Sequence, residues 1–152
     1  MLARGKLRTL GGDERGVSVI ELGLIAPVLA LFIAGIIDLS QGLAQRFAMQ
    51  QAVNGSLELL LARPLEADLG EDEVDYDYIV DHAAAAADVT EDDVTVDLWL
   101  QCDDLRMDDY SDTCPSGEDS ARYFSLRIDK PFTGSFFVGE VDLFATGVMR
   151  IQ

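Results

Sequence analysis

The sequence has few basic residues for its size. Lys and Arg number 11 among 152 residues, against 28 Asp and Glu, and the formal net charge is −17. Because a strongly acidic surface is repelled by nucleic-acid phosphate, this balance argues against DNA or RNA binding. We therefore predict partners other than nucleic acids.

Groups that support catalysis are also scarce. The single histidine, His82, precedes an alanine run, where a lone imidazole is more often a surface or packing residue than a general base. The sequence contains no G-x-x-x-x-G-K-[ST] phosphate loop, no dinucleotide-binding fingerprint and no G-x-S-x-G elbow. It also reveals no His and Asp arrangement that would activate a serine. We predict that the chain is not an enzyme and needs no cofactor.

Only two cysteines are present, Cys102 and Cys114. A zinc site needs about four ligands, more than two thiols and His82 readily supply, so we predict no metal site. If this region is exported, we expect the two thiols to form a disulfide, which stabilises a fold by about 3 kcal/mol in the chain-entropy model. The intervening loop is rich in aspartate, but its spacing does not follow the EF-hand pattern. Binding of calcium or of a partner by loop 102–114 is left open.

Charge and hydropathy divide the chain into three parts. Residues 1–16 contain four basic and two acidic side chains, whereas the rest of the chain contains seven basic and twenty-six acidic ones. Residues 17–37 are nearly all apolar, and their number is close to the roughly 20 that span a hydrocarbon core. A basic head, an apolar run and an acidic body is the charge order of a protein inserted with its N-terminus in the cytoplasm.

The N-terminal segment allows three interpretations. A cleaved signal peptide ending at residues 28–30 is disfavoured, because the apolar run continues to Ile37 and a carboxylate, Glu21, interrupts it. An uncleaved transmembrane anchor fits the length but leaves Gly16 and Glu21 without a function. Cleavage between Gly16 and Val17 accounts for both residues, and we favour it.

Such a cut would give Glu21 a specific function. The new α-amino group at Val17 would be cationic and about 6 Å from Glu21 along the helix axis, one turn away. In a stack of related helices, Glu21 of one subunit could neutralise the Val17 amine of its neighbour. A charge inside the membrane is less unfavourable when it is paired, so the pair would favour one axial register.

The residues around this site resemble a known family. Gly16 followed by Val17-Ser18-Val19-Ile20-Glu21 resembles the processing site of type IV pilin-like precursors, with Gly before the cut and Glu at mature position five. The continuation resembles TadE-like pseudopilins of the tight-adherence (Flp-type) pilus system. The residues that carry this second resemblance are Pro27, then Gly35-Ile36-Ile37-Asp38, then Gln50-Gln51-Ala52-Val53-Asn54.

The resemblance covers roughly residues 14–63 in detail, and one residue departs from it. Leu22 stands where an aromatic side chain often follows the Glu. The resemblance implies a minor pilin or pseudopilin that takes part in initiating, priming or capping a tight-adherence pilus after cleavage by a prepilin peptidase. Its implied partners are that peptidase, other pilins or pseudopilins, the inner-membrane assembly platform and the lipid bilayer.

The implied location is the bacterial inner membrane. The chain would cross it once, with a cytoplasmic N-terminus and a periplasmic C-terminal domain, and incorporation into the fibre is left open. The main alternative is an uncleaved single-pass inner-membrane protein whose acidic periplasmic domain binds a partner protein.

Beyond the bilayer we expect the helix to continue to residue 63, because Pro64 marks a stop. Apolar residues recur at spacings of three and four along it. This stripe would meet neighbouring subunits near the membrane and the chain's own domain further along. The candidates for helix packing are Pro27, Gly35, Leu39, Leu43 and Phe47, followed by Val53, Leu57 and Leu61 in the distal part.

The remaining residues predict a small α+β domain. An acidic connector at 66–77 leads into a helix over about 74–87, which contains an alanine block. Lys130-Pro131 and Gly134 indicate a break between the second and third strands, and Gly147 weakens the third. Alternating apolar residues predict strands at 94–100, 123–128 and 141–151.

We therefore predict an α+β fold in three parts. Residues 1–16 form a cytoplasmic leader, and residues 17–63 form a transmembrane and extended pilin-like helix. Residues 64–152 form an acidic extracytoplasmic domain, in which a second helix packs on a three-stranded antiparallel sheet.

Overall fold

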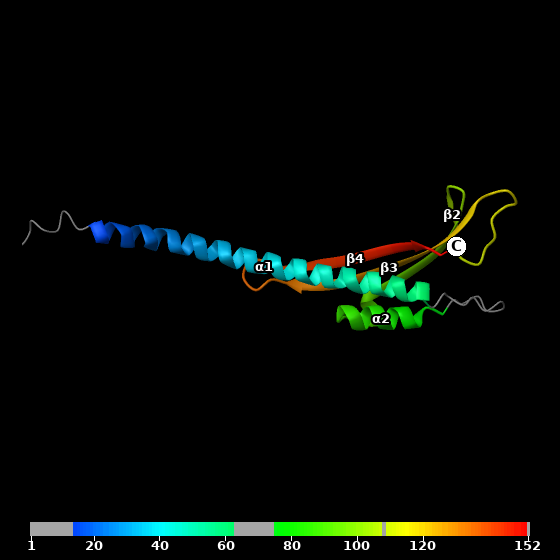
Figure 1. Ribbon diagram of the computed structural model, residues 1–152, viewed down its shortest axis with the longest axis horizontal. Coiled ribbons are helices and arrows are strands. Elements are labelled where there is room, and N and C mark those ends of the chain that lie inside the picture. The colour runs from blue at the N-terminus through cyan, green and yellow to red at the C-terminus, as the bar shows by residue number, and fades with distance from the viewer. Residues whose placement is uncertain (1–13, 63–74, 108, 152) are drawn as a thin grey trace, which may run out of the picture.

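The computed structural model describes residues 14–62, 75–107 and 109–151, with side chains from Ser18 onward. It is an elongated molecule in which a long helix projects from a small domain, and the predicted α+β class is confirmed (Figure 1). Most of the predicted leader, most of the acidic connector and Pro64 lie outside the described residues. The elements are α1 (Glu14–Ala62), α2 (Asp77–Ala87), the 3-10 helix η2 (Glu91–Asp93), β1 (Val94–Cys102), β2 (Leu105–Met107), β3 (Ser120–Thr133) and β4 (Glu140–Arg150).

The first helix, α1, runs without interruption for 49 residues. Aliphatic side chains and alanine favour the helix, which continues through Pro27 although that residue removes one backbone donor. Side chains from Ser18 to Ile33 are exposed, and the first fully buried residue of α1 is Asp38. The described part of α1 begins slightly earlier than the predicted helix of residues 17–63.

The second helix, α2, begins at Asp77, later than the predicted start at about 74, because Asp75 and Tyr76 are not helical. It ends at Ala87, and the next residue, Asp88, has a left-handed φ of 54°. The Nζ of Lys130 donates hydrogen bonds to the carbonyls of Ala87 and Asp88 at 2.9 and 2.7 Å. These bonds satisfy acceptors that the end of a helix leaves unpaired, and they attach α2 to β3.

Among the described residues, four strands form one antiparallel sheet in the order β2-β1-β3-β4. Phe124 of β3 lies opposite Leu98 of β1 and Met149 of β4, so apolar residues of three strands share the face turned to the helices. The prediction of three strands was therefore wrong by one. The additional strand, β2, has three residues, which is too short for an alternating pattern to show.

β3 is also longer than the predicted strand at 123–128. It continues through Lys130-Pro131, which the sequence had indicated as a break. β1 begins at Val94, opposite Ile128, so beyond that point β3 pairs only with β4. A proline is tolerated on such an edge because no ladder donor is needed there.

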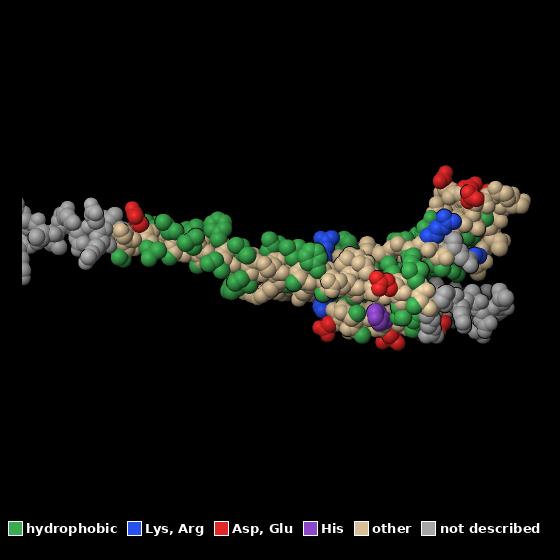
Figure 2. Space-filling view, viewed as in Figure 1, with side chains coloured by type: hydrophobic (Ala, Val, Ile, Leu, Met, Phe, Trp, Pro, Cys, Tyr) green, Lys and Arg blue, Asp and Glu red, His purple; other side chains and the backbone are tan. Residues whose placement is uncertain are grey.

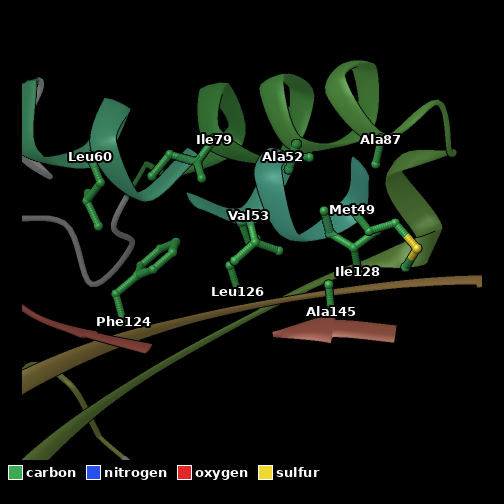
Figure 3. Close-up of a cluster of buried hydrophobic side chains, with 11 residues drawn as sticks. Met49, Ala52, Val53, Leu60, Ile79, Ala87, Phe124, Leu126, Ile128 and Ala145 are labelled. Atoms are coloured by element: carbon green, nitrogen blue, oxygen red, sulfur yellow. The ribbon is translucent and has the colours of Figure 1, made fainter. Parts of the chain in front are cut away.

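The hydrophobic core lies between α1, α2 and the inner face of the sheet (Figure 3). Removing these side chains from water is the main stabilising contribution to the domain. The buried cluster comprises Met49, Ala52, Val53 and Leu60 of α1, Ile79, Ala83 and Ala87 of α2, Phe124, Leu126 and Ile128 of β3, and Ala145 of β4.

Gly147 of β4 allows α1 to approach the sheet closely. A Cβ at this position would lie 2.6 Å from Cγ1 of Val53 and 2.8 Å from Cδ1 of Leu57. The glycine that weakens an isolated strand is thus required by the helix packed on that strand.

Candidate assembly interface

The N-terminal half of α1 extends away from the domain. Residues 18–37, which we call the projecting segment, belong to a helix that is long and apolar enough to cross a membrane. Figure 2 shows hydrophobic side chains along this half, with acidic atoms near its N-terminal end. A helix that is apolar around its circumference is suited to a surrounding of lipid or of other helices. The projecting segment is therefore the candidate interface of the molecule.

The predicted processing and register residues lie at the far end of this helix. Gly16 and Val17 are in the first turns of α1, and the side chain of Glu21 is exposed further along the same helix. The structure thus places the proposed cut and the carboxylate on one continuous helix, remote in sequence from the buried residues that begin at Asp38.

The predicted packing residues lie along the exposed surface of α1. Pro27 and Gly35 are in the projecting segment, and a Cβ at Gly35 would meet no atom within 4 Å. Leu39, Leu43 and Phe47 are 63%, 44% and 63% exposed. They extend the apolar surface of the projecting segment along the half of α1 that carries the domain.

The buried face of α1 is offset from the predicted stripe. Val53 is buried and Leu57 packs against the core, as predicted for the distal part, but Leu61 is 68% exposed. Two polar residues, Asp38 and Ser56, are fully buried instead. A pattern based on hydrophobicity misplaces this face because polar side chains lie on it and apolar ones lie beside it.

Asp38 connects the end of the projecting segment to the domain. Its carboxylate accepts hydrogen bonds from four successive backbone N–H groups, with N···O distances between 2.6 and 3.1 Å. The donors are the amides of Ser135, Phe136, Phe137 and Val138. They belong to the turn between β3 and β4, residues 134–139, which we call the proximal loop.

The proximal loop fits tightly against α1. Its N–H of Gly134 donates to the carbonyl of Val138 at 2.9 Å, and the Ser135 hydroxyl donates to Oε1 of Gln41 at 3.1 Å. A Cβ at Gly134 would lie 2.8 Å from Oδ2 of Asp38, so only glycine fits there without displacement. The loop therefore has a fixed position at the base of the projecting segment.

Asp38 follows the apolar run that ends at Ile37, and it lies on the domain side of that run. Its N–H partners hold the pKa of Asp38 below the ordinary value, the Phe137 amide contributing most, although burial opposes them. The carboxylate is therefore ionised at neutral pH. Its carboxylate oxygens accept hydrogen bonds from the loop amides, so Asp38 has a structural function.

The opposite end of the domain carries the disulfide between Cys102 and Cys114. Residues 103–119, which include the short strand β2 and which we call the distal loop, have their ends joined by two further hydrogen bonds. The Asp103 N–H donates to the Asp119 carbonyl, and the Asp119 N–H donates to the Asp103 carboxylate, both at 2.9 Å. Among the residues that the structure describes, no group of three or more His, Cys, Asp or Glu is placed to hold a metal ion.

The face of the sheet turned away from the helices carries a ladder of aromatic and charged side chains. The rings of Trp99 and Tyr123 stack with centroids 5.3 Å apart, and the Arg106 guanidinium lies 4.4 Å from the Trp99 ring. Arg127 and Asp129 form an ion pair at 2.7 Å. Because these side chains are paired with one another, we assign them to stabilising the sheet.

One serine and the histidine meet between the helices. Oγ of Ser56 lies 3.0 Å from Nδ1 of His82, a contact that the sequence did not reveal. Ser56 is fully buried, so its hydroxyl cannot reach a substrate. The contact attaches α1 to α2, which is a packing function for His82.

Comparison with known proteins supports the resemblance seen in the sequence. Residues 16–56 match the model of a family described as TadE-like protein. No curated protein and no solved structure matches the chain. The matched region begins at Gly16 and contains Glu21, the rest of the projecting segment and Asp38. The predicted resemblance is confirmed: residues 16–56 of the chain are similar to the TadE-like family.

Proposed function

We propose that this protein is a minor pilin or pseudopilin that takes part in initiating, priming or capping a tight-adherence pilus. The observation that carries the proposal is the division of α1 into two halves. Residues 18–37 project with exposed apolar side chains, whereas the half from Asp38 onward bears the domain. Such a molecule can place its projecting segment among other pilin helices while its domain stays outside them.

The proposal includes cleavage by a prepilin peptidase between Gly16 and Val17. The α-amino group released at Val17 would be about 6 Å from Glu21 along the axis of the same helix. In a bundle of subunits, Glu21 neutralises the Val17 amine of a neighbour and so selects one axial register. The exposure of Glu21 supports this function, since the carboxylate is accessible to another chain.

The proposed placement is a single pass through the bacterial inner membrane. The basic leader, residues 1–16, stays in the cytoplasm, and the domain of residues 64–152 lies in the periplasm. The disulfide between Cys102 and Cys114 supports an oxidising compartment for that domain. The size of the domain favours a minor component over the abundant subunit of a fibre.

The exposed surface of α1 provides the contacts for assembly. Leu39, Leu43 and Phe47 remain accessible beside the domain, and Pro27 and Gly35 lie in the projecting segment. We assign these five residues to packing against other pilins or against the inner-membrane assembly platform. No reaction is assigned to the chain, because the TadE-like family is structural and the serine beside His82 is buried.

Substitution of Glu21 tests the register function. Glu21→Gln keeps the size of the side chain and removes its charge, so we expect normal membrane insertion and fewer pili. Glu58→Gln is the matched control, because Glu58 is an exposed carboxylate on the other half of the same helix. Pili would be counted by electron microscopy and insertion by membrane fractionation. Normal piliation in Glu21→Gln would contradict the register function.

A further inference from the structure

Two exposed phenylalanines lie where the projecting segment ends. Phe136 and Phe137 of the proximal loop are 60% and 58% exposed, and the N–H of each donates to the Asp38 carboxylate. In Figure 1 this loop, drawn in orange, reaches along α1 towards the projecting half. Two adjacent large apolar side chains in water indicate an interaction surface.

We infer that the proximal loop is a second membrane contact, in which Phe136 and Phe137 insert into the surface of the bilayer that residues 17–37 span. The inference rests on the membrane insertion included in the proposed function. It adds a lipid-binding site in the domain itself, so that the domain is held against the bilayer by a loop as well as by the helix.

The length of the membrane-spanning part of α1 places the proximal loop at the bilayer surface. Residues 17–37 extend about 31 Å at 1.5 Å per residue, which equals the roughly 30 Å of a hydrocarbon core. Asp38 therefore lies at the boundary between hydrocarbon and headgroups. Because the loop is bonded to Asp38, its phenylalanines lie at the depth where amphipathic segments bury apolar side chains.

The distribution of charge also favours an orientation in which the proximal loop faces the bilayer. The proximal loop, residues 134–139, contains no charged side chain, whereas the distal loop, residues 103–119, contains seven acidic residues and one basic residue. Charged side chains are unfavourable inside a bilayer, so the uncharged proximal loop can enter its surface and the acidic distal loop cannot. The end of the domain beside the projecting segment is thus the one suited to lipid.

The Asp38 contact also makes insertion of the loop less unfavourable, because it satisfies backbone donors. Unpaired backbone N–H groups are strongly unfavourable in an apolar medium, which is why irregular loops avoid lipid. Here the four N–H groups from Ser135 to Val138 are all bonded to one buried carboxylate. The loop can therefore present its two phenylalanines to lipid with these donors already satisfied.

The test uses the full chain in lipid vesicles with single tryptophans as depth probes. Trp99 is the only tryptophan, so Trp99→Phe provides the background and keeps an aromatic ring beside Tyr123. Phe137→Trp reports the loop, and Val28→Trp reports the middle of the span. Leu105→Trp is the matched control, because Leu105 is 66% exposed at the distal end. Phe136→Trp gives a second reading of the loop.

Vesicles contain lipids brominated either near the headgroups or deep in the acyl chains, and bromine quenches nearby tryptophan. We expect Phe137→Trp to show a blue-shifted emission that shallow bromines quench, Val28→Trp to be quenched by deep bromines, and Leu105→Trp to be unquenched. A solvent-like, unquenched Phe137→Trp beside a quenched Val28→Trp would overturn the inference and leave the proposed function standing.

Two other outcomes also count against the inference. A blue-shifted but unquenched Phe137→Trp would mean that protein, such as a second copy of the chain, covers the loop in place of lipid. An unquenched Val28→Trp would overturn both the inference and the membrane insertion on which it rests.

Discussion

Asp38 shows how one side chain can fix the position of a small domain on a long, largely apolar helix. A buried carboxylate is unfavourable unless it is paired with a cation or satisfied by hydrogen bonds. Four N–H groups of the proximal loop supply that satisfaction. Gly134 leaves the space that brings them within reach. The same contact therefore stabilises the acid, orders the loop and attaches the sheet to α1.

Asp38→Asn is expected to destabilise the protein and release the proximal loop. The amide is nearly the same size, but it replaces one acceptor oxygen by an N–H₂ group that faces N–H donors. Thermal unfolding of the full chain in detergent should show a lower Tm, and limited proteolysis should cut the loop. Asp104→Asn is the control, because Asp104 is exposed at the other end of the domain. Equal Tm values for the two variants would contradict this function of Asp38.

The Asp38 contact should also depend on pH. Since hydrogen bonding lowers the pKa of Asp38 in the folded state, its stabilisation is fully present above the ordinary carboxyl pKa and is lost as pH falls through the lowered value. The Tm difference between wild type and Asp38→Asn should thus be largest near neutrality and shrink below about pH 4. A difference that stays constant down to strongly acidic pH would show that the charge contributes nothing.

The sequence alone predicts the contacts of some of these residues, and it misses those of others for a physical reason. The pairing of Cys102 with Cys114 was predictable on the premise of export, because two thiols in an oxidising compartment can pair within the chain only with each other. The function of Asp38 was not, because its partners lie 97 to 100 residues away in the chain. An acid directly after an apolar run was the one available signal.

The secondary-structure elements were predictable where one face is consistently apolar. Alternation in β1 and β3 follows from burial against the helices, and it predicted the presence of both strands. The extension of β3 through Pro131 was hidden, because it depends on where β1 begins. The buried face of α1 was hidden as well, since Asp38 and Ser56 lie on it.

The contact between α1 and β4 can be tested with Gly147→Ala. The added Cβ would collide with Val53, a buried β-branched side chain that has little freedom to rotate away. Overpacking of this kind lowers the free energy of unfolding by about 1–3 kcal/mol. Gly139→Ala is the control, because a Cβ there meets no atom within 4 Å. Denaturant titration of both variants would measure the difference, and equal stabilities would contradict close packing at Gly147.

The two ends of the molecule differ in chemical character. An apolar projecting segment occupies one end, and the acidic distal loop occupies the other (Figure 2). Between them, one core joins the second half of α1 to α2 and the sheet. A force that moves the helix along its axis therefore moves the domain with it, which suits a subunit inserted into a growing assembly by its helix.

The most direct test is the N-terminal sequence of the mature protein, isolated from membranes of cells that are making the pilus. The proposed function predicts a chain that begins at Val17, because only that cut creates the amine that Glu21 neutralises. An intact N-terminus would indicate an uncleaved membrane protein whose acidic domain binds a partner, and a start at Leu31 would indicate secretion. Either result would contradict assembly through Glu21.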